Sequence, residues 1–165
     1  MKKEEHPEVD RLVELLKEVH TCMLITHERF NGELAGRPMG ITKVEPDGTM
    51  WFFAKVMSQK VEELEHDEQV SVVIIDEKKN IYLMIHGKGD ISYDKEKMKE
   101  LWNPTMKAWF PEGLDDPDMV LIKIIPTEAK YWESSSSKMV VLFNMVKAAV
   151  TGKEYDEGSM GKINL

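Results

Sequence analysis

The chain is poor in cysteine and has no long hydrophobic run. Its 165 residues contain one cysteine, Cys22, which excludes an intrachain disulfide and a cysteine-based metal cluster. Apolar residues follow Cys22, so we expect a buried thiol that fills space in the core. No apolar segment approaches the roughly 20 residues that a membrane-spanning helix needs. The charged start MKKEEHPEVDR has no apolar signal region. These absences predict a cytoplasmic protein that does not enter a membrane.

The chain also lacks an excess of basic residues. It carries 22 Lys and Arg against 30 Asp and Glu, which gives a formal net charge of −8. Nucleic acids and anionic membrane surfaces are bound by basic faces, so this balance argues against both as partners. The five histidines do not show the HExxH type of metal-ligand spacing, and we therefore expect no metal. A small local site for an anion remains compatible with the overall charge.

Short apolar segments make up most of the chain. Residues after Pro7 repeat apolar side chains at the spacing of one helix face, which predicts an amphipathic helix. Two more helices are expected at 58–67 and 94–110, where Ser58 and Asp94 are suited to be N-caps. Runs typical of strands lie at 22–30, 39–45, 49–55, 69–76, 81–93, 119–126 and 128–134.

The connections between the expected strands are short. Pro-Asp-Gly at 46–48 indicates a tight hairpin turn, and the glycine-rich segment 31–38 is expected to be a loop. Two glycines inside 81–93 indicate a bulge or the close approach of another group. Connections of this length exclude most parallel crossovers. We therefore predict a mainly β fold, a small closed antiparallel barrel with peripheral helices, as one domain over 1–165.

The C-terminal part is expected to hold a helix at 137–151 and a mobile tail at 152–165. The helix is apolar on nearly every side, which a monomer in water would not expose. It is therefore expected to pack on the barrel with one side and on a partner subunit, or over a ligand pocket, with another.

One stretch, 36–60, gathers groups that bind phosphate. A phosphate monoester is held by N–H groups at a helix start, by a hydroxyl and by cations. Ser58, Gln59 and Lys60 supply these at the start of the second helix, and Arg37 precedes them with a fork suited to phosphate. The alternative interpretation is a surface hairpin followed by an ordinary capped helix. Aromatic residues at Trp102, Trp109 and Phe110 either roof a ligand or pack in the core.

Several motifs recur in a fixed order along the chain. RPMGIT is followed by DGTMWFFAKVMSQK, then YLMIHGKGDI, then AWFPEGLDDPDMVLIKIIP and AKYWE. In this order the chain resembles the flavin-binding split-barrel superfamily that includes pyridoxamine 5′-phosphate oxidase, and within it the short general-stress-protein branch. The resemblance covers roughly residues 9–133.

The resemblance implies a split β-barrel homodimer that holds flavin mononucleotide (FMN) in a groove between subunits. By position it assigns these residues to the cofactor: Arg37, Pro38, Met39, Gly40, Ile41 and Thr42 along the flavin, Phe53 and Ala54 beside the isoalloxazine ring, Ser58, Gln59 and Lys60 at the phosphate, Tyr82 and Trp132 near the ring. Gln59 stands where the oxidase has a basic residue. The basic and aromatic groups that hold the oxidase's pyridoxal substrate have no match in 153–165, so that activity itself is not expected.

The function expected from the resemblance is that of an FMN-binding general-stress protein. A flavin accepts hydride or electrons, which predicts an oxidoreductase with NAD(P)H as a candidate donor and a small molecule as substrate. No side chain stands out as an acid or base, so no catalytic residue is assigned. One alternative is a flavin carrier, buffer or sensor without turnover. Another is a barrel that holds a deazaflavin or haem in the same groove.

Overall fold

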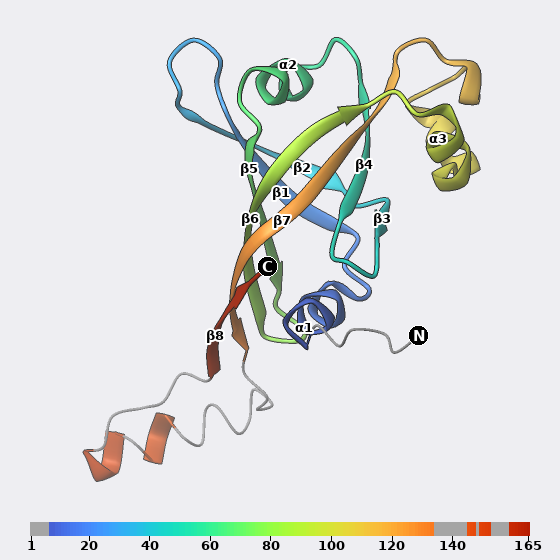
Figure 1. Ribbon diagram of the computed structural model, residues 1–165. Helices are drawn as coiled ribbons and strands as arrows, with labels where there is room; N and C mark the ends of the chain where they lie inside the picture. Colours follow the sequence, from blue (N-terminus) through green and yellow to red (C-terminus); the bar gives the residue numbers. More distant parts are fainter. Residues whose placement is uncertain (1–6, 134–144, 148, 153–158) are drawn as a thin grey trace.

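The computed structural model describes residues 7–133, 145–147, 149–152 and 159–165. The described part is one curled antiparallel sheet with helices at its periphery (Figure 1). The strands are β1 (Thr21–His27), β2 (Leu34–Gly40), β3 (Lys43–Val44), β4 (Met50–Lys55), β5 (Gln69–Asp76), β6 (Ile81–Ser92), β7 (Met119–Glu133) and β8 (Ser159–Asn164). The helices are α1 (Pro7–Leu16), α2 (Gln59–His66) and α3 (Lys95–Leu101), followed by the short 3-10 turns η1 (Pro104–Ala108) and η2 (Gly113–Asp115).

The sheet curls because its two end strands are neighbours in sequence. The strand order is β2-β1-β5-β6-β7-β4-β3, and β8 pairs with β7 off this path. Only Ile41 and Thr42 separate the end of β2 from the start of β3, and the three residue steps from Gly40 to Lys43 span at most about 11 Å. The two ends of the sheet must therefore lie close together. Among the described residues no ladder joins β2 to β3, so the closed barrel that we expected is a split one.

The core fills the inside of this curl. Leu12 and Leu16 of α1 cover the barrel interior, where they pack in one buried cluster with Met50 and Phe52 of β4. Cys22 belongs to the same cluster, and burial raises the pKa of its thiol to about 12. The predicted buried thiol is therefore confirmed, and at neutral pH it carries no thiolate.

The bulge expected in the long strand lies between His86 and Gly87, where the register of β6 against β7 shifts. A Cβ on Gly87 would come within 2.5 Å of the carbonyl oxygen of Ile125, so only glycine fits there. Pro126, which has no N–H to donate, stands opposite this glycine. The bulge lets β7 pass the proline without a break, so the two strands expected at 119–126 and 128–134 are one.

Two other expectations at the ends of strands were wrong. Leu34–Pro38 were expected in a loop, but they pair with β1 as part of β2, and their side chains alternate between exposed and half-buried. The tail was expected to be mobile, but its last residues form β8, which pairs with Glu128–Glu133 of β7. Ile163 of β8 is buried in the core, and this anchors the strand. Main-chain pairing of this kind leaves little trace in side-chain patterns.

Most of the helix expected at 137–151 lies outside the described residues. The described residues 145–147 and 149–151 are helical, and Figure 1 shows this segment away from the sheet. Met145, Val146 and Val150 are exposed in the single chain, and the expected packing of the rest of the helix lies outside the described residues. In the described part of the chain, no helix combines the length and the hydropathy that crossing a bilayer requires.

Candidate functional site

A cavity of about 790 Å³ lies beside the split in the barrel. Its volume falls in the range of about 300–1,000 Å³ that is usual for small-molecule sites. The end of β2, the link to β3, β4 and the start of α2 form one wall, and the segment from α3 to η1 forms the other. The lining residues are His20, Pro38, Met39, Gly40, Ile41, Thr42, Phe53, Ala54, Lys55, Ser58, Lys60, Leu101, Trp102, Asn103, Thr105, Met106, Trp109 and Phe110.

Strand β4 can carry one wall because both of its faces are buried. Successive side chains of a strand point to opposite faces, so Phe52 enters the barrel core while Phe53 faces outward. Phe53 packs in a second cluster with Leu101 and Phe110. The continuous apolar sequence of β4 therefore reflects two cores, one inside the barrel and one under the α3–η1 segment.

The α3–η1 segment forms a roof over the cavity. Trp102 meets Phe53 edge-on, with ring centroids 6.1 Å apart, and Phe110 packs on Phe53 at the same distance. Asn103 holds the start of η1, because its side chain accepts a hydrogen bond from the N–H of Thr105 at 3.0 Å. Phe110 is buried, whereas 60% of Trp109 is exposed at the cavity. Of the aromatic residues considered for a roof, Phe110 is therefore core and Trp109 faces the opening.

The start of α2 forms one end of the cavity. Ser58 occupies the N-cap position, but its hydroxyl donates to the carbonyl oxygen of Lys55 at 2.6 Å and does not cap the helix. The N–H groups of Gln59 and Lys60 begin the helix and have no acceptor inside it. They are available to an anion, together with the positive end of the helix dipole.

Lys60 is the cation of this end. It lines the cavity and has no carboxylate in ion-pair range among the described residues. Burial lowers the pKa of its ammonium group below the usual 10.5, and the positive charge of Arg37 lowers it further, while Glu63 acts in the opposite direction. The attraction of a negatively charged ligand would offset both unfavourable effects.

Arg37 has a different environment and does not line the cavity. Its guanidinium donates to Glu63 Oε2 at 2.7 Å and to the hydroxyl of Thr26. Thr26 in turn donates to the same Glu63 oxygen at 2.6 Å. Glu63 is 2% exposed and Thr26 fully buried. In a single chain Arg37 thus compensates a buried carboxylate, and it acts on Lys60 through its charge.

Three other residues assigned from the resemblance lie outside the cavity. Gln59 is exposed beside it. Tyr82 and Trp132 stand opposite each other on β6 and β7, and both are exposed on the outward face of the sheet. The structure therefore brings together the residues from Pro38 to Thr42 with those of β4 and α2, but not these three.

Some lining residues were not assigned from the sequence. Asn103 and Thr105 had a usable signal, because Asn before Pro104 is typical of a turn that starts a short helix. His20 follows α1 in a connection, and no local pattern places it at the cavity. Lys55 ends β4 and is half-exposed, so it reads as an ordinary surface residue.

The cavity offers what a planar ligand with a phosphate needs. Phe53, Trp102 and Trp109 supply flat apolar surfaces. At the other end the free N–H groups of α2 and the partly buried Lys60 supply positive charge. Because Lys60 has no carboxylate partner among the described residues, this group and the N–H groups of α2 fit a phosphate-bearing cofactor such as FMN.

Comparisons with known sequences support one family. A family model described as pyridoxamine 5′-phosphate oxidase like matches residues 7–156. Protein bli-3 of Neurospora crassa is 24% identical over 140 residues, which are 79% of this chain and 67% of that protein. General stress protein 26 of Bacillus subtilis is 25% identical over 88 residues, 52% of this chain and 62% of that protein. The matches thus span about two thirds of the length of these curated relatives.

Solved structures share the fold. A structure named as a general stress protein 26 from Jannaschia sp. has a TM-score of 0.74 at 23% identity, covering 92% of this chain and 94% of its own. A general stress FMN/FAD binding protein from Xanthomonas citri has a TM-score of 0.67 at 25% identity, and the match covers 81% of this chain and 93% of that protein. A heme binding protein from Mycobacterium smegmatis has a TM-score of 0.61 at 12% identity, and the match covers 79% of this chain and 55% of that protein.

The comparisons and the fold agree with the resemblance found in the sequence motifs. The family model covers nearly all of the described residues, and several of the structural neighbours are named as general stress proteins. The chain belongs to the pyridoxamine 5′-phosphate oxidase-like family.

Proposed function

We propose that the chain binds FMN in the cavity beside the split of the barrel. The ring would lie against Pro38–Thr42 and Phe53, and the phosphate would lie at the start of α2 beside Lys60. The observation that carries this proposal is the unpartnered Lys60 at the helix N-terminus, in the same cavity as the aromatic residues. A solved neighbour named as an FMN/FAD binding protein supports the cofactor class.

We propose a flavin-dependent oxidoreductase as the activity, with NAD(P)H as electron donor. A bound flavin supplies hydride- and electron-accepting chemistry. The residues of this chain bind and orient: Lys60 and the N–H groups of α2 hold the phosphate, and Phe53 with the roof residue Trp102 excludes water from the ring. Trp109 would lie at the entrance through which a substrate reaches the ring.

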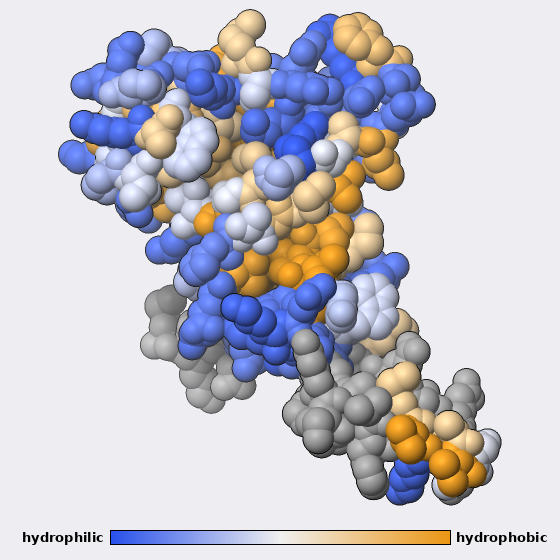
Figure 2. Space-filling model, turned by 180° about the vertical axis from the view of Figure 1, so that it is seen from behind, coloured by the Kyte–Doolittle hydropathy of each residue, from blue (hydrophilic) through white to orange (hydrophobic). Residues whose placement is uncertain are grey.

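The proposed site includes a second copy of the chain. Ile75, Tyr82, Trp132 and Met160 are direct cross-strand neighbours on β5, β6, β7 and β8, and all four are exposed. The next row on this face holds Met23, Val73 and Met84. Figure 2 shows hydrophobic side chains gathered in the middle of the face seen from behind.

Such an apolar face favours a homodimer. Its partner would bring Tyr82 and Trp132 to the other subunit's cavity, which explains why they were assigned to the cofactor from the resemblance but lie apart from the cavity in one chain. Sedimentation equilibrium tests this: Trp132→Arg is expected to shift a dimer toward monomer, whereas the exposed Lys78→Glu, which lies in the β5–β6 turn, is not. A monomeric parent chain would contradict the dimer.

Absorbance of the purified chain, alone and with FMN added, tests the cofactor. Bound flavin gives two bands in the visible and near-ultraviolet range, and quenched flavin fluorescence on titration would give the affinity. NAD(P)H consumption with an electron acceptor then separates the oxidoreductase from a carrier, buffer or sensor, which binds flavin but consumes no NAD(P)H. Failure to bind FMN or riboflavin would contradict the proposal.

Haem is the second candidate. A heme binding protein shares the fold, and His20 is the one imidazole among the described residues that line the cavity. His27 and His86 are both directed elsewhere, toward Asp67 and Ser71. A Soret band that disappears in His20→Ala would favour haem over flavin.

A further inference from the structure

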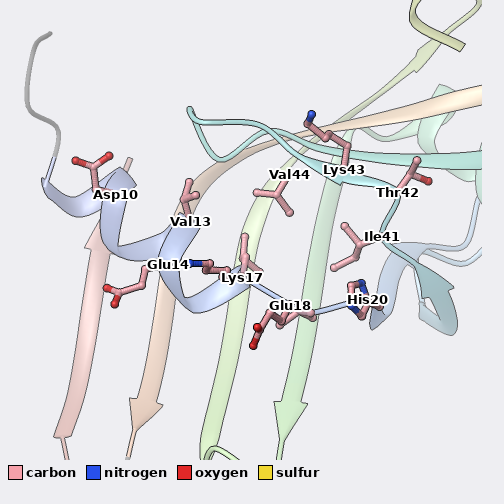
Figure 3. A pocket seen from close by; sticks show the side chains of 12 residues that line it. Asp10, Val13, Glu14, Lys17, Glu18, His20, Ile41, Thr42, Lys43 and Val44 are labelled. Atoms are coloured by element: carbon pink, nitrogen blue, oxygen red, sulfur yellow. The ribbon is translucent and has the colours of Figure 1, made fainter. Parts of the chain in front are cut away.

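A second concave site adjoins the cavity at the split in the barrel. It lies between α1 and the link from β2 to β3 and has a volume of about 620 Å³ (Figure 3). We call it the α1 groove. His20, Ile41 and Thr42 line both the α1 groove and the cavity. The N–H of Ile41 donates to the carbonyl oxygen of His20 at 2.9 Å, and the N–H of Thr42 donates to the carbonyl oxygen of Trp51 at 2.8 Å. One fixed stretch of backbone therefore separates the two sites.

The floor of the α1 groove is apolar. Figure 3 shows Val13 of α1, Ile41 of the link and Val44 of β3 directed into the space between these elements. Leu16 and Val19 add to this surface. Three elements thus converge on one hydrophobic trough, with a volume typical of small-molecule sites. A trough of this size suits a compact aliphatic body better than a folded partner, whose interface is larger and flatter.

The charges around the α1 groove are asymmetric. Glu14 and Glu18 line the groove, but Figure 3 shows their carboxylates directed away from Val13 and Val44. Glu14 is paired there with Arg11 at 3.0 Å and Glu18 with Lys79 at 2.9 Å.

Among the described residues, Lys17 and Lys43 have no carboxylate within ion-pair distance. Lys17 directly follows α1, and Lys43 projects from β3 on the opposite rim. Asp10, seven residues before Lys17, is the remaining lining carboxylate. Because Glu14 and Glu18 are paired with Arg11 and Lys79, the two lysines outnumber Asp10, the one lining carboxylate without an ion pair among the described residues.

We propose that the α1 groove binds an amphipathic monoanion, a molecule with an aliphatic body and one carboxylate or comparable acidic head. The body would lie on Val13, Ile41 and Val44, where burial of apolar surface stabilises it. The head would lie between Lys17 and Lys43, whose long side chains can turn toward it. A cationic amphiphile of the same length would meet two like charges. This site does not depend on the cofactor proposed for the neighbouring cavity.

Calorimetric titration of the full chain with decanoate, decylamine and decanol tests this. We expect decanoate to bind, decanol to bind more weakly and decylamine not to bind. In the variant Lys17→Glu/Lys43→Glu the dissociation constant for decanoate should rise roughly tenfold, and decylamine should gain affinity. The control variant Lys78→Glu/Lys95→Glu changes the net charge equally at exposed positions outside the groove. Its dissociation constant for decanoate should stay within about twofold of that of the parent chain.

A second variant separates the groove from general charge effects. Val44→Trp would fill the trough and should remove binding of all three probes while circular dichroism stays that of the folded chain. Equal affinity for decanoate and decylamine in the parent chain would overturn the proposal, as would an unchanged decanoate affinity after charge reversal.

Repeating the titrations with the chain saturated with FMN keeps the two proposals apart. Decanoate binding without any flavin binding contradicts only the cofactor, and the reverse result contradicts only the groove.

Discussion

Arg37 and Lys60 were assigned to the same phosphate from the sequence, yet the fold gives them opposite environments. Arg37 faces inward, where it pairs with the buried Glu63. Lys60 stands one helical turn before Glu63 on α2 but faces the cavity, and no ion pair compensates its charge among the described residues. Similar charge on neighbouring elements therefore serves two purposes. One cation stabilises the fold, and the other is available to a ligand.

The largest expected effect comes from removing the inward cation. Arg37→Ala leaves Glu63 buried with only Thr26 as partner, and breaking a buried pair in this way costs about 3–5 kcal/mol. The free energy of unfolding from urea titration should fall by roughly this amount. The double variant Arg37→Ala/Glu63→Ala should recover much of the loss, because no uncompensated charge remains. A loss below about 1 kcal/mol would show that Arg37 is not the partner on which Glu63 depends.

Removing the outward cation should act on the ligand instead. Lys60→Ala loses a charged contact worth roughly 1.5–3 kcal/mol, which is about a 10- to 150-fold loss of FMN affinity. Riboflavin has no phosphate, so its affinity should change little. The unfolding free energy without ligand should stay the same or rise, because burial disfavours the charged ammonium in the folded chain. Equal losses of affinity for FMN and riboflavin would show that Lys60 does not bind the phosphate.

The pH dependence of FMN binding sharpens the same contrast. The anion favours the protonated ammonium of Lys60, so affinity is full below the pKa of Lys60 in the free chain and falls as pH rises through it. Because burial and Arg37 lower this pKa below 10.5, the fall should begin at a lower pH than for an ordinary lysine. Fluorescence titrations between pH 7 and 9.5 would measure it, with Lys60→Ala and riboflavin as controls that lack the contact between Lys60 and the phosphate.

The smallest effect is expected at Ser58. Its hydroxyl bonds to Lys55 and not to the helix, so Ser58→Ala should cost less than about 1 kcal/mol of stability, below the usual loss for an N-cap. Asp94, the N-cap of α3, gives the reference. Asp94 accepts from the N–H groups of Glu96 and Lys97, and Asp94→Ala should cost more. Thermal unfolding of both variants would rank them, and the reverse order would mean that Ser58 caps α2 after all.

The sequence was sufficient for the elements that depend on side-chain pattern. The helix after Pro7, the cap at Asp94 and the bulge at the glycines of β6 follow from spacing and from local chemistry. The split barrel and most of one cavity wall followed from ordered motifs. Residues 38–42, Phe53, Ala54, Ser58 and Lys60 do meet in one cavity.

What could not be predicted depends on contacts between distant parts of the chain. Arg37 was expected to be available because a sequence does not show that Glu63, on a later helix, would come to lie 2.7 Å from it. His20 reaches the cavity only because the split brings the end of α1 beside the β2–β3 link. The strand β8 was missed for the same reason, since its partner lies some 30 residues earlier along the chain.

The C-terminal strand has a practical consequence. Along its second half β7 has β6 on one side and β8 on the other, and the N–H of Leu165 extends the contact to the carbonyl oxygen of Thr127. A chain shortened before residue 159 would uncover the main-chain donors and acceptors from Glu128 to Glu133, next to Trp132. Exposed edge strands pair with other chains and cause aggregation. An affinity tag or fluorescent fusion is therefore better placed at the N-terminus, where it leaves β8 undisturbed. A truncated chain that precipitates would show the loss of β8 and not a defect of the cofactor site.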